Sequence, residues 1–330
     1  MTVEATTPAK LAFLFPGQGS QAVGMGKALA DAFPEARAVF DEADAALGYG
    51  LSKLCFEGPE AELTLTANAQ PAILATSIAA LRVLQRLAPG ARPAVVAGHS
   101  LGEYSALVAS GALTLADAVR VVNARGRFMQ EAVPAGVGAM AAILGLGAAE
   151  VEAACRDAAA GEVVSAANLN GAGQVVIAGH KDAVARACAL LTERGAKKAI
   201  PLAVSAPFHC ALMRPAAERL AAELERVKIA PPAVPVVTNV EATPNHDAAR
   251  VRELLVRQVT APVRWEESVE RVAALGVTAA VELGAGKVLT GMVKRIAKAI
   301  VPYAAGDPDS VTATASALSG APAPKEPSHG

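Results

Sequence analysis

The chain has 330 residues, which suffices for one large domain or two smaller ones with a buried core. Lysine and arginine together number 30 and aspartate and glutamate 31, so the net charge of -1 gives no indication of nucleic acid or a membrane surface as a partner. Apolar residues make up 53% and charged residues 18%, a composition that excludes an intrinsically disordered chain.

The sequence predicts neither a membrane-spanning helix nor an export signal. Two uncharged stretches, Leu63–Leu81 and Ala132–Ala149, are interrupted by polar residues, prolines or glycines. After Lys10, only five apolar residues precede Pro16-Gly17, fewer than the apolar core of a signal peptide requires. The four cysteines form no C-x-x-C pair, so we expect reduced thiols, no bound metal and a cytoplasmic protein.

In the first part of the chain, short apolar runs alternate with helical patterns. Buried strands are predicted at Leu11–Phe15, which ends at Pro16-Gly17, and at Ala94–Ala97. Helices are predicted at Pro34–Leu47, Ala67–Leu87, Glu103–Ser110 and Leu115–Ala132.

The middle of the chain has a different rhythm, in the order β-α-β-β-α-β. This order is typical of a ferredoxin-like domain. We therefore expect a small domain at 135–203, inserted into a larger domain made of 1–134 and 204–318. Its predicted elements are the strands Gly138–Leu144, Val163–Asn168, Gln174–Ala178 and Lys197–Pro201 and the helices Ala148–Ala158 and Lys181–Arg194.

After the small domain, the chain returns to alternating strands and helices. This alternation predicts the α/β class, with a parallel sheet that helices cover on both faces. The proline-rich segment 319–330 is expected to be disordered. The predicted elements are the helices Leu212–Val227, Val251–Val259 and Trp265–Leu275 and the strands Val234–Asn239 and Val277–Leu283.

One motif indicates chemistry, Gly98-x-Ser100-x-Gly102. It follows a predicted strand and precedes a predicted helix, which is the context of a nucleophile elbow. The sharp turn presents the serine hydroxyl, and the amide of Leu101 points to the place where an oxyanion would form. The alternative interpretation is a glycine-flanked helix N-cap at Ser100.

A serine nucleophile needs a base, and His209 is the best candidate among the five histidines. It lies in a loop between a strand and a helix, where a purely structural histidine is the alternative. Asp117, Asp157 and Asp182 lie between the serine and the histidine, but each has the pattern of a helix-start or surface residue. The base is therefore oriented either by one of these acids or by a backbone carbonyl or an amide.

Four segments occur in an order that resembles one family. They are Phe15-Pro-Gly-Gln-Gly-Ser-Gln21, Gly98-His-Ser-Leu-Gly-Glu-Tyr-Ser105, Ala124-Arg-Gly-Arg-Phe-Met129 and Ala206-Pro-Phe-His209. From about Leu11 to Leu318, the chain resembles the malonyl-CoA:acyl carrier protein transacylase family of type II fatty acid synthesis, whose pattern polyketide synthase acyltransferase domains share. The resemblance implies an α/β-hydrolase-like large domain with an inserted ferredoxin-like domain.

The resemblance also implies roles for the matching residues. Ser100 would be the nucleophile and His209 its base, and the backbone carbonyl of Gln258 would orient the histidine. The amides of Gln18 and Leu101 would form the oxyanion hole.

Substrate selection would rest on Arg125, whose guanidinium is expected to bind the free carboxylate of a malonyl group. Arg127 faces elsewhere on the same helix. Phe208 is expected to favour malonyl over branched acyl groups, or else to be a core aromatic. Asn168, at the end of a small-domain strand, is expected to line the cleft between the domains, or else only to form a turn.

The implied function is transfer of a malonyl group from malonyl-CoA to the phosphopantetheine thiol of an acyl carrier protein, through a malonyl-serine ester, in fatty acid biosynthesis. No permanently bound cofactor, metal, nucleic acid or membrane is expected. Gly284-Ala-Gly-Lys287 lacks the full P-loop pattern, so it predicts no nucleotide site. A trans-acting polyketide synthase acyltransferase, a serine esterase or thioesterase, and a non-catalytic binding module are the alternatives.

Overall fold

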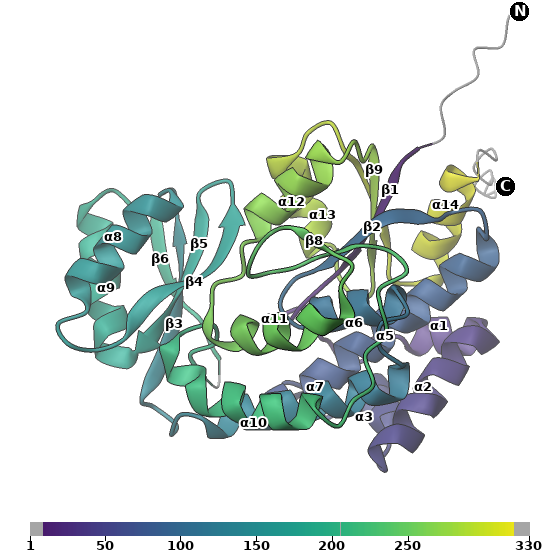
Figure 1. Cartoon of the computed structure of the whole chain (residues 1–330), viewed down its shortest axis with the longest axis horizontal. Coiled ribbons are helices and arrows are strands. Elements are labelled where there is room, and N and C mark those ends of the chain that lie inside the picture. Colours follow the sequence, from purple (N-terminus) through teal and green to yellow (C-terminus); the bar gives the residue numbers. More distant parts are fainter. Residues whose placement is uncertain (1–8, 205, 320–330) are drawn as a thin grey trace, which may run out of the picture.

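The computed structural model describes residues 9–204 and 206–319, which form two β-sheets with helices packed against them (Figure 1). Apart from Ser319, the tail predicted at 319–330 lies outside the described residues. In the described part of the chain, no helix is long and apolar enough to cross a membrane.

The larger sheet has six strands in the order β10-β9-β1-β2-β7-β8. Neighbouring strands from β10 to β7 pair in parallel, whereas β8 runs antiparallel to β7. The predicted parallel sheet is therefore confirmed. Its strands are β1 (Leu11–Phe15), β2 (Pro93–Gly98), β7 (Val236–Val237), β8 (Pro244–Asn245), β9 (Ala279–Leu283) and β10 (Val301–Ala305).

Successive side chains of β1 point to opposite faces of this sheet and belong to two different cores. Leu11, Phe13 and Phe15 pack into a core with helices α2, α5, α6 and α7. Ala12 and Leu14 pack into a core with α12 and α13. Helices therefore cover both faces, as a parallel sheet requires. These helices are α2 (Pro34–Leu47), α5 (Thr66–Leu87), α6 (Gly102–Ala109), α7 (Leu115–Glu131), α12 (Trp265–Ala274) and α13 (Val288–Ile296).

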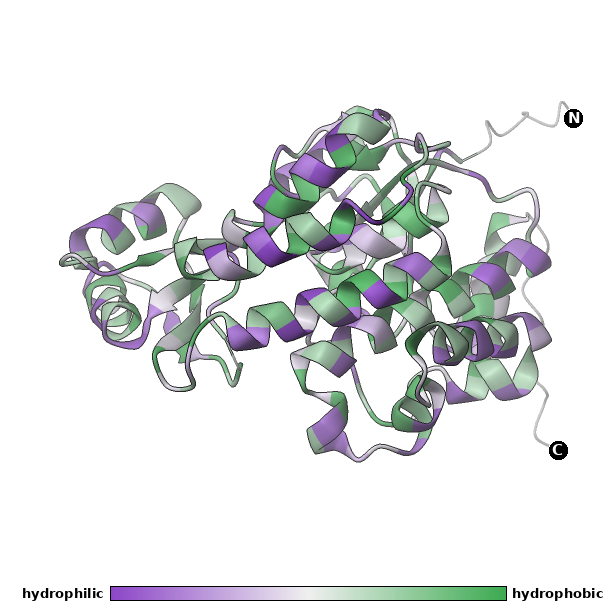
Figure 2. Cartoon of the chain, turned by 60° about the horizontal axis from the view of Figure 1, so that its bottom comes forward, coloured by the Kyte–Doolittle hydropathy of each residue, from purple (hydrophilic) through white to green (hydrophobic). Residues whose placement is uncertain are grey.

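The remaining helices of the larger unit pack around these layers. Hydrophobic and hydrophilic residues alternate along the helices as bands (Figure 2), which is the pattern of helices that bury one side. The remaining helices are α1 (Lys27–Ala32), α3 (Leu51–Glu57), α4 (Glu60–Leu63), the 3-10 helix η1 (Ala211–Met213), α10 (Arg214–Leu224), α11 (Ala248–Thr260) and α14 (Pro308–Leu318).

The second sheet is antiparallel, with the strand order β4-β5-β3-β6, and it lies apart from the larger sheet (Figure 1). Two helices pack on it around a separate hydrophobic core. The predicted β-α-β-β-α-β order and the ferredoxin-like fold are confirmed, while the domain boundaries at 134/135 and 203/204 stay predictions. The elements are β3 (Gly138–Leu144), α8 (Ala148–Ala158), β4 (Val164–Gly171), β5 (Gln174–His180), α9 (Lys181–Glu193) and β6 (Lys198–Pro201).

Backbone hydrogen bonds connect β4 of the small sheet to the segment that precedes α12. The Val263 N–H donates to the Ala167 carbonyl at 2.9 Å, and the Leu169 N–H donates to the Val263 carbonyl at 2.8 Å. Asn168 lies between the two bonded residues of β4, so these bonds fix its position relative to the larger unit.

The structure differs from the predicted elements at β7 and in several elements near both ends of the chain. The strand predicted at Val234–Asn239 is only Val236–Val237, because proline has no N–H to donate to a ladder and the chain turns after Asn239. The prolines of this segment are Pro231, Pro232 and Pro235. The sequence did not predict α1, α3, α4, α13, β10 or α14.

Candidate active site

The Gly-x-Ser-x-Gly motif forms a tight turn between β2 and α6. Ser100 has a φ of 49°, in the left-handed region that residues with side chains rarely adopt. A Cβ atom on Gly98 would lie 1.9 Å from the carbonyl of Gly102, and one on Gly102 would lie 2.0 Å from the carbonyl oxygen of Phe15. Both glycines are therefore required for the strand to turn this sharply into the helix.

A chain of hydrogen bonds leads from the serine through His209. The Ser100 Oγ atom lies 2.7 Å from His209 Nε2, and His209 Nδ1 lies 2.8 Å from the backbone carbonyl oxygen of Gln258. Because a carbonyl only accepts hydrogen bonds, Nδ1 carries the proton, and Nε2 is left to accept one from the serine hydroxyl.

The three acids considered for a triad lie elsewhere. The Asp117 carboxylate accepts from the Thr114 hydroxyl at 2.8 Å and pairs with Arg120, and Asp157 pairs with Arg194. Asp182 is exposed in the first turn of α9. The sequence left open whether an acid, a backbone carbonyl or an amide orients the histidine. In the structure, the group that contacts Nδ1 of His209 is the backbone carbonyl of Gln258.

Two backbone amides near the serine, those of Leu101 and Gln18, have no acceptor among the described residues. The Ser100 N–H donates to Oδ1 of Asn239 at 2.6 Å, so it is already satisfied. Within residues 9–204 and 206–319, neither the amide of Leu101 nor that of Gln18 donates a hydrogen bond. The Gln18 loop lies against the elbow, because a Cβ atom on Gly17 would lie 2.5 Å from the carbonyl oxygen of His99. Two unused N–H donors of this kind are what an oxyanion hole needs.

Arg125 of α7 is buried beside the serine, with 1% of its surface exposed. Its guanidinium donates to Oε1 of Gln70 at 2.8 Å, to Oε1 of Gln258 at 2.9 Å and to Ser100 Oγ at 3.3 Å. The next residue, Gly126, allows α7 to approach α5 closely, since a Cβ atom there would lie 2.4 Å from the Thr66 carbonyl oxygen.

No carboxylate of the described residues forms an ion pair with this guanidinium. A buried cation without an ionic partner costs several kcal/mol of desolvation, so the site is suited to an anion from outside the chain. Arg127, two residues on, instead stacks on the ring of Phe128 and is exposed.

The serine and the histidine line a cleft of about 530 Å³, a volume typical of small-molecule sites. Asn168 from β4 and Phe208 from the loop before η1 line the same cleft. Five of the residues that the sequence singled out line this cleft, namely Gln18, Ser100, Asn168, Phe208 and His209, whereas Leu101, Arg125 and Gln258 are not among its lining residues. The other lining residues are Gly19, Gln21, Thr64, Leu65, Thr66, His99, Met129, Met140, Leu202, Ala203 and Val204.

His99 also lines the cleft, a position that the sequence did not predict. Its Nε2 lies 2.9 Å from Oδ1 of Asn170, and its ring centroid lies 5.5 Å from that of Trp265. These contacts hold its ring away from the serine hydroxyl, so His209 is the histidine in contact with Ser100.

Three buried polar residues around the site were missed by sequence reasoning: Gln70, Glu103 and Asn239. Gln70 contacts both Arg125 and Gln18 from within an otherwise apolar stretch of α5, and this isolated amide was the available signal. Glu103 accepts from Nε2 of Gln258 at 2.6 Å and from the Asn239 N–H at 3.1 Å.

Burial shifts the pKa of two groups in opposite directions. Burial, and then the positive charge of Arg125, lowers the pKa of His209 to about 3, so the imidazole is neutral at physiological pH. Burial raises the pKa of Glu103 to about 7, although its hydrogen bonds to Gln258 and Asn239 oppose this shift.

Acylation of the free protein should therefore show no titration of the base between pH 8 and 5. Lowering the pKa favours the neutral imidazole, whereas a histidine with an ordinary pKa of about 6.5 would leave only about one thirtieth unprotonated at pH 5. We expect the rate of Ser100 sulfonylation by phenylmethanesulfonyl fluoride to be independent of pH over this range in a Glu103→Gln variant. This variant removes the buried carboxyl of Glu103, whose pKa of about 7 would otherwise titrate in the same range. An inflection near pH 6.5 would contradict this assignment.

Two further groups near the site take structural roles. The carboxylate of Glu282 accepts from the amides of Leu289 and Thr290, so it already caps the helix that follows Gly284-Ala-Gly-Lys287. The Cys210 thiol donates to a backbone carbonyl, and burial raises its pKa to about 11, so it is no thiolate at neutral pH. No group of three or more His, Cys, Asp or Glu residues in the described ranges has a geometry that could hold a metal ion.

Comparison with known proteins places these features in context. The family model of the acyl transferase domain matches residues 12–314. A malonyl CoA-acyl carrier protein transacylase of Salmonella typhimurium is 53% identical over 304 residues, which cover 92% of this chain and 98% of that protein. One of Bacillus subtilis strain 168 is 50% identical over 303 residues, covering 92% and 95%.

Solved structures agree with this result. The crystal structure of an acyl carrier protein S-malonyltransferase from Vibrio cholerae has a TM-score of 0.90 and 50% identity, with coverage of 93% of this chain and all (100%) of that chain. A type II polyketide synthase acyl-carrier protein in complex with its malonyl-transacylase provides a second match, with a TM-score of 0.90 and 48% identity, covering 94% and 100%.

Proposed function

This chain belongs to the acyl transferase domain family, and we propose that it transfers a malonyl group from malonyl-CoA to the phosphopantetheine thiol of an acyl carrier protein. It is a malonyl-CoA:acyl carrier protein S-malonyltransferase, and the pathway that we propose for it is fatty acid biosynthesis. The observation that carries the substrate assignment is the buried guanidinium of Arg125, which lies 3.3 Å from the serine hydroxyl and has no carboxylate partner among the described residues.

In the first step, the Ser100 hydroxyl attacks the thioester carbonyl while Nε2 of His209 takes its proton. The negative charge on the carbonyl oxygen is stabilised by the amides of Leu101 and Gln18. The histidine then returns the proton to the departing CoA sulfur, which leaves a malonyl ester on the serine.

In the second step, the phosphopantetheine thiol of the carrier protein gives its proton to Nε2 of His209 and attacks the ester. The same two amides stabilise the second tetrahedral oxyanion. Collapse of this intermediate breaks the bond to the serine oxygen, which recovers the proton from the histidine. The backbone carbonyl of Gln258 keeps the imidazole in one tautomer throughout.

Arg125 selects the substrate by its charge and by the geometry of its donors. A guanidinium forms two parallel hydrogen bonds to a carboxylate, and these are strong in a site that excludes water. Acetyl-CoA would occupy the same cleft but leave the cation unpaired, which penalises its transfer. Phe208 and Asn168, which line the cleft, limit the size of the acyl group.

A trans-acting acyltransferase of a polyketide pathway is a second candidate, because one solved relative is bound to a polyketide synthase carrier protein. Both candidates use the same acyl-enzyme chemistry and differ in the carrier. Transfer rates to carrier proteins of the two kinds, measured at equal concentration, distinguish them.

An Asp182→Asn variant should transfer malonyl groups at a rate close to that of the unmodified protein. Asp182 is exposed on the small unit, and Nδ1 of His209 already contacts a backbone carbonyl, so no triad acid is lost. The rate of carrier malonylation at saturating substrate measures this. A loss of about a thousandfold or more would instead identify a triad acid.

One assay distinguishes a transferase from a thioesterase. The protein is mixed with malonyl-CoA with and without a phosphopantetheine thiol, and both malonyl-thioester and free malonate are quantified. We expect CoA release to be sustained only with the thiol, since a transferase excludes water from its ester. Equal CoA release without the thiol would indicate a thioesterase.

Malonyl-CoA is the substrate, and the transfer requires no permanently bound cofactor in this mechanism. The location that we propose is the cytoplasm, where thiols stay reduced, and the described cysteines carry no disulfide.

A further inference from the structure

A buried asparagine, Asn239, connects β7 to both sides of the elbow. It lies two residues after the end of β7, and 1% of its surface is exposed. Its side-chain Oδ1 accepts from the Ser100 N–H at 2.6 Å, and its Nδ2 donates to the Gly98 carbonyl at 2.7 Å. The amide plane therefore binds the two backbone groups on either side of His99.

These two contacts act on the residue that the turn strains most. Ser100 has its φ at 49°, so its backbone would relax toward an ordinary conformation without an external restraint. An amide side chain offers one acceptor and two donors in a fixed plane, which matches an N–H and a carbonyl two residues apart. An ionised Asp or Glu accepts hydrogen bonds but cannot donate one, and Ser is too short to reach both groups.

The bond to the Ser100 N–H also decides which amide stays free. If that N–H were unpaired, it would compete with the next one for the developing oxyanion. With Asn239 as its acceptor, the amide of Leu101 is the unused donor of the elbow in the described residues. The same side chain thus orients the nucleophile and leaves the oxyanion donor available.

The backbone of Asn239 is itself held at both ends. Its N–H donates to the buried carboxylate of Glu103 at 3.1 Å, and its carbonyl accepts from the Arg264 N–H at 2.9 Å. Glu103 belongs to α6, the helix that begins at the elbow. The asparagine is therefore fixed relative to the helix whose first turn it supports.

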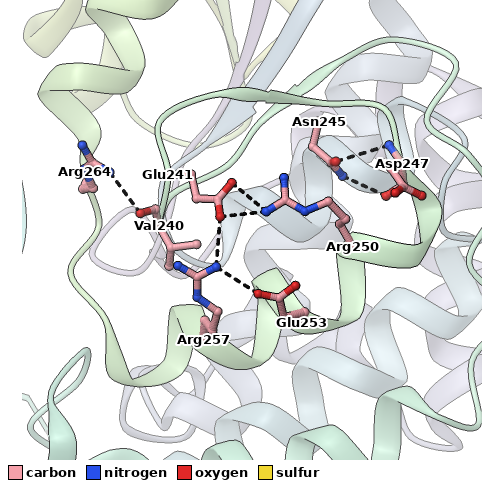
Figure 3. A network of polar contacts seen from close by, with 8 residues as sticks. All are labelled: Val240, Glu241, Asn245, Asp247, Arg250, Glu253, Arg257 and Arg264. Atoms are coloured by element: carbon pink, nitrogen blue, oxygen red, sulfur yellow. Dashed lines mark hydrogen bonds and ion pairs between the residues drawn. The ribbon is translucent and has the colours of Figure 1, made fainter.

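Ion pairs on the surface fix the loop that follows (Figure 3). Glu241 accepts two hydrogen bonds from Arg250 and one from Arg257, and Arg264 donates to the Val240 carbonyl. Arg250 and Arg257 belong to α11, the same helix whose Gln258 carbonyl contacts His209. One helix thus supports both the loop that holds the nucleophile and the residue that holds the base.

We infer that Asn239 is a positioning residue for acylation, holding the strained Ser100 peptide so that the hydroxyl faces His209 while the Leu101 amide stays free. This inference rests on the proposed role of Ser100 as the nucleophile. Loss of the restraint misplaces the hydroxyl relative to its base, and a displacement of about 1 Å costs about a hundredfold in rate.

The test is a single-turnover measurement of acylation by malonyl-CoA, with the malonyl adduct quantified by intact-protein mass after rapid quenching. Its rate constant reports the chemistry, and its amplitude reports the fraction of folded protein, so a merely structural role lowers only the amplitude. For Asn239→Ala, we expect a rate constant lower by about a hundredfold, with a half-saturating malonyl-CoA concentration within about twofold of the unmodified protein, since Arg125 does not contact Asn239.

Asn245→Ala is the matched control, because Asn245 is a buried asparagine of the same hairpin. Among the described residues, its side chain forms hydrogen bonds with the backbone of Asp247 alone (Figure 3). Its rate constant should equal that of the unmodified protein. Asn239→Asp preserves the shape of the side chain, but the ionised carboxylate cannot donate to the Gly98 carbonyl. If Asn239→Ala does not fold, the acylation rate constant of Asn239→Asp tests the positioning role instead.

A rate constant for these Asn239 variants within about twofold of the unmodified protein, or an equal slowing by Asn245→Ala, would overturn the inference. If the unmodified protein forms no adduct with malonyl-CoA, the proposed function fails instead, and the two failures are thereby distinguished.

Discussion

A His209→Ala variant is expected to form the malonyl-serine ester about a thousandfold more slowly than the unmodified protein. The imidazole lies 2.7 Å from the Ser100 hydroxyl and is kept neutral by burial, so its removal leaves the hydroxyl without a proton acceptor. The half-saturating concentration of malonyl-CoA should change little, because the guanidinium of Arg125 remains. Rapid-quench acylation kinetics measure both quantities.

His180→Ala is the matched control for this variant. His180 is a histidine of the small unit, where its ring accepts from the Val163 N–H at 2.9 Å, and it is not among the residues that line the cleft. The acylation rate should therefore remain that of the unmodified protein. A His209→Ala variant that is acylated as fast as His180→Ala would exclude His209 as the base.

An Arg125→Ala variant should lose malonyl transfer while keeping or improving acetyl transfer. Removing one partner of a buried charge pair costs about 2–5 kcal/mol, which is roughly thirty- to several-thousandfold in kcat/KM for malonyl-CoA. Acetyl-CoA carries no carboxylate, so it loses no interaction and no longer leaves a buried cation unpaired. The ratio of kcat/KM for the two thioesters is the decisive quantity.

Two companion variants separate charge recognition from general damage. Arg127→Ala removes an exposed arginine two residues along the same helix and should leave the ratio unchanged. Arg125→Lys keeps the charge but cannot form two parallel bonds, so an intermediate ratio is expected. Equal losses with malonyl-CoA and acetyl-CoA in Arg125→Ala would exclude a role in binding the carboxylate.

The parts of the site that lie close together in the sequence were predictable from it. Gly98, Ser100 and Gly102 form one contiguous motif, and their spacing encodes the turn because each glycine faces backbone atoms where no Cβ fits. The β-α-β-β-α-β order of the small unit was predictable for the same reason, since every element has a local pattern.

The contacts between distant segments were not predictable from local patterns. Gln70, Glu103 and Asn239 reach the site from α5, α6 and the end of β7, and a single buried amide or acid gives no periodic signal. The roles expected of Arg125 and Gln258 came only from the resemblance to a family, because neither helix pattern indicates what its buried polar side chain contacts.

Prediction of the elements failed where tertiary contacts override local preference. The strand predicted at Val234–Asn239 is shortened because the Asn239 side chain and backbone pair with the elbow, Glu103 and Arg264 rather than with a neighbouring strand. Edge strand β10 contains Pro302 and is mostly half-buried, so it lacks the continuous apolar run of β1. The short helices near the N-terminus have too few residues for a periodic pattern to stand out.

The most direct test of the whole account is the mass of the intact protein after mixing with malonyl-CoA, beside a Ser100→Ala control. We expect a malonyl adduct on the unmodified protein alone, and a phosphopantetheine thiol should discharge it faster than water does. An adduct of equal yield on the Ser100→Ala variant, or the absence of any adduct while CoA is released, would contradict it.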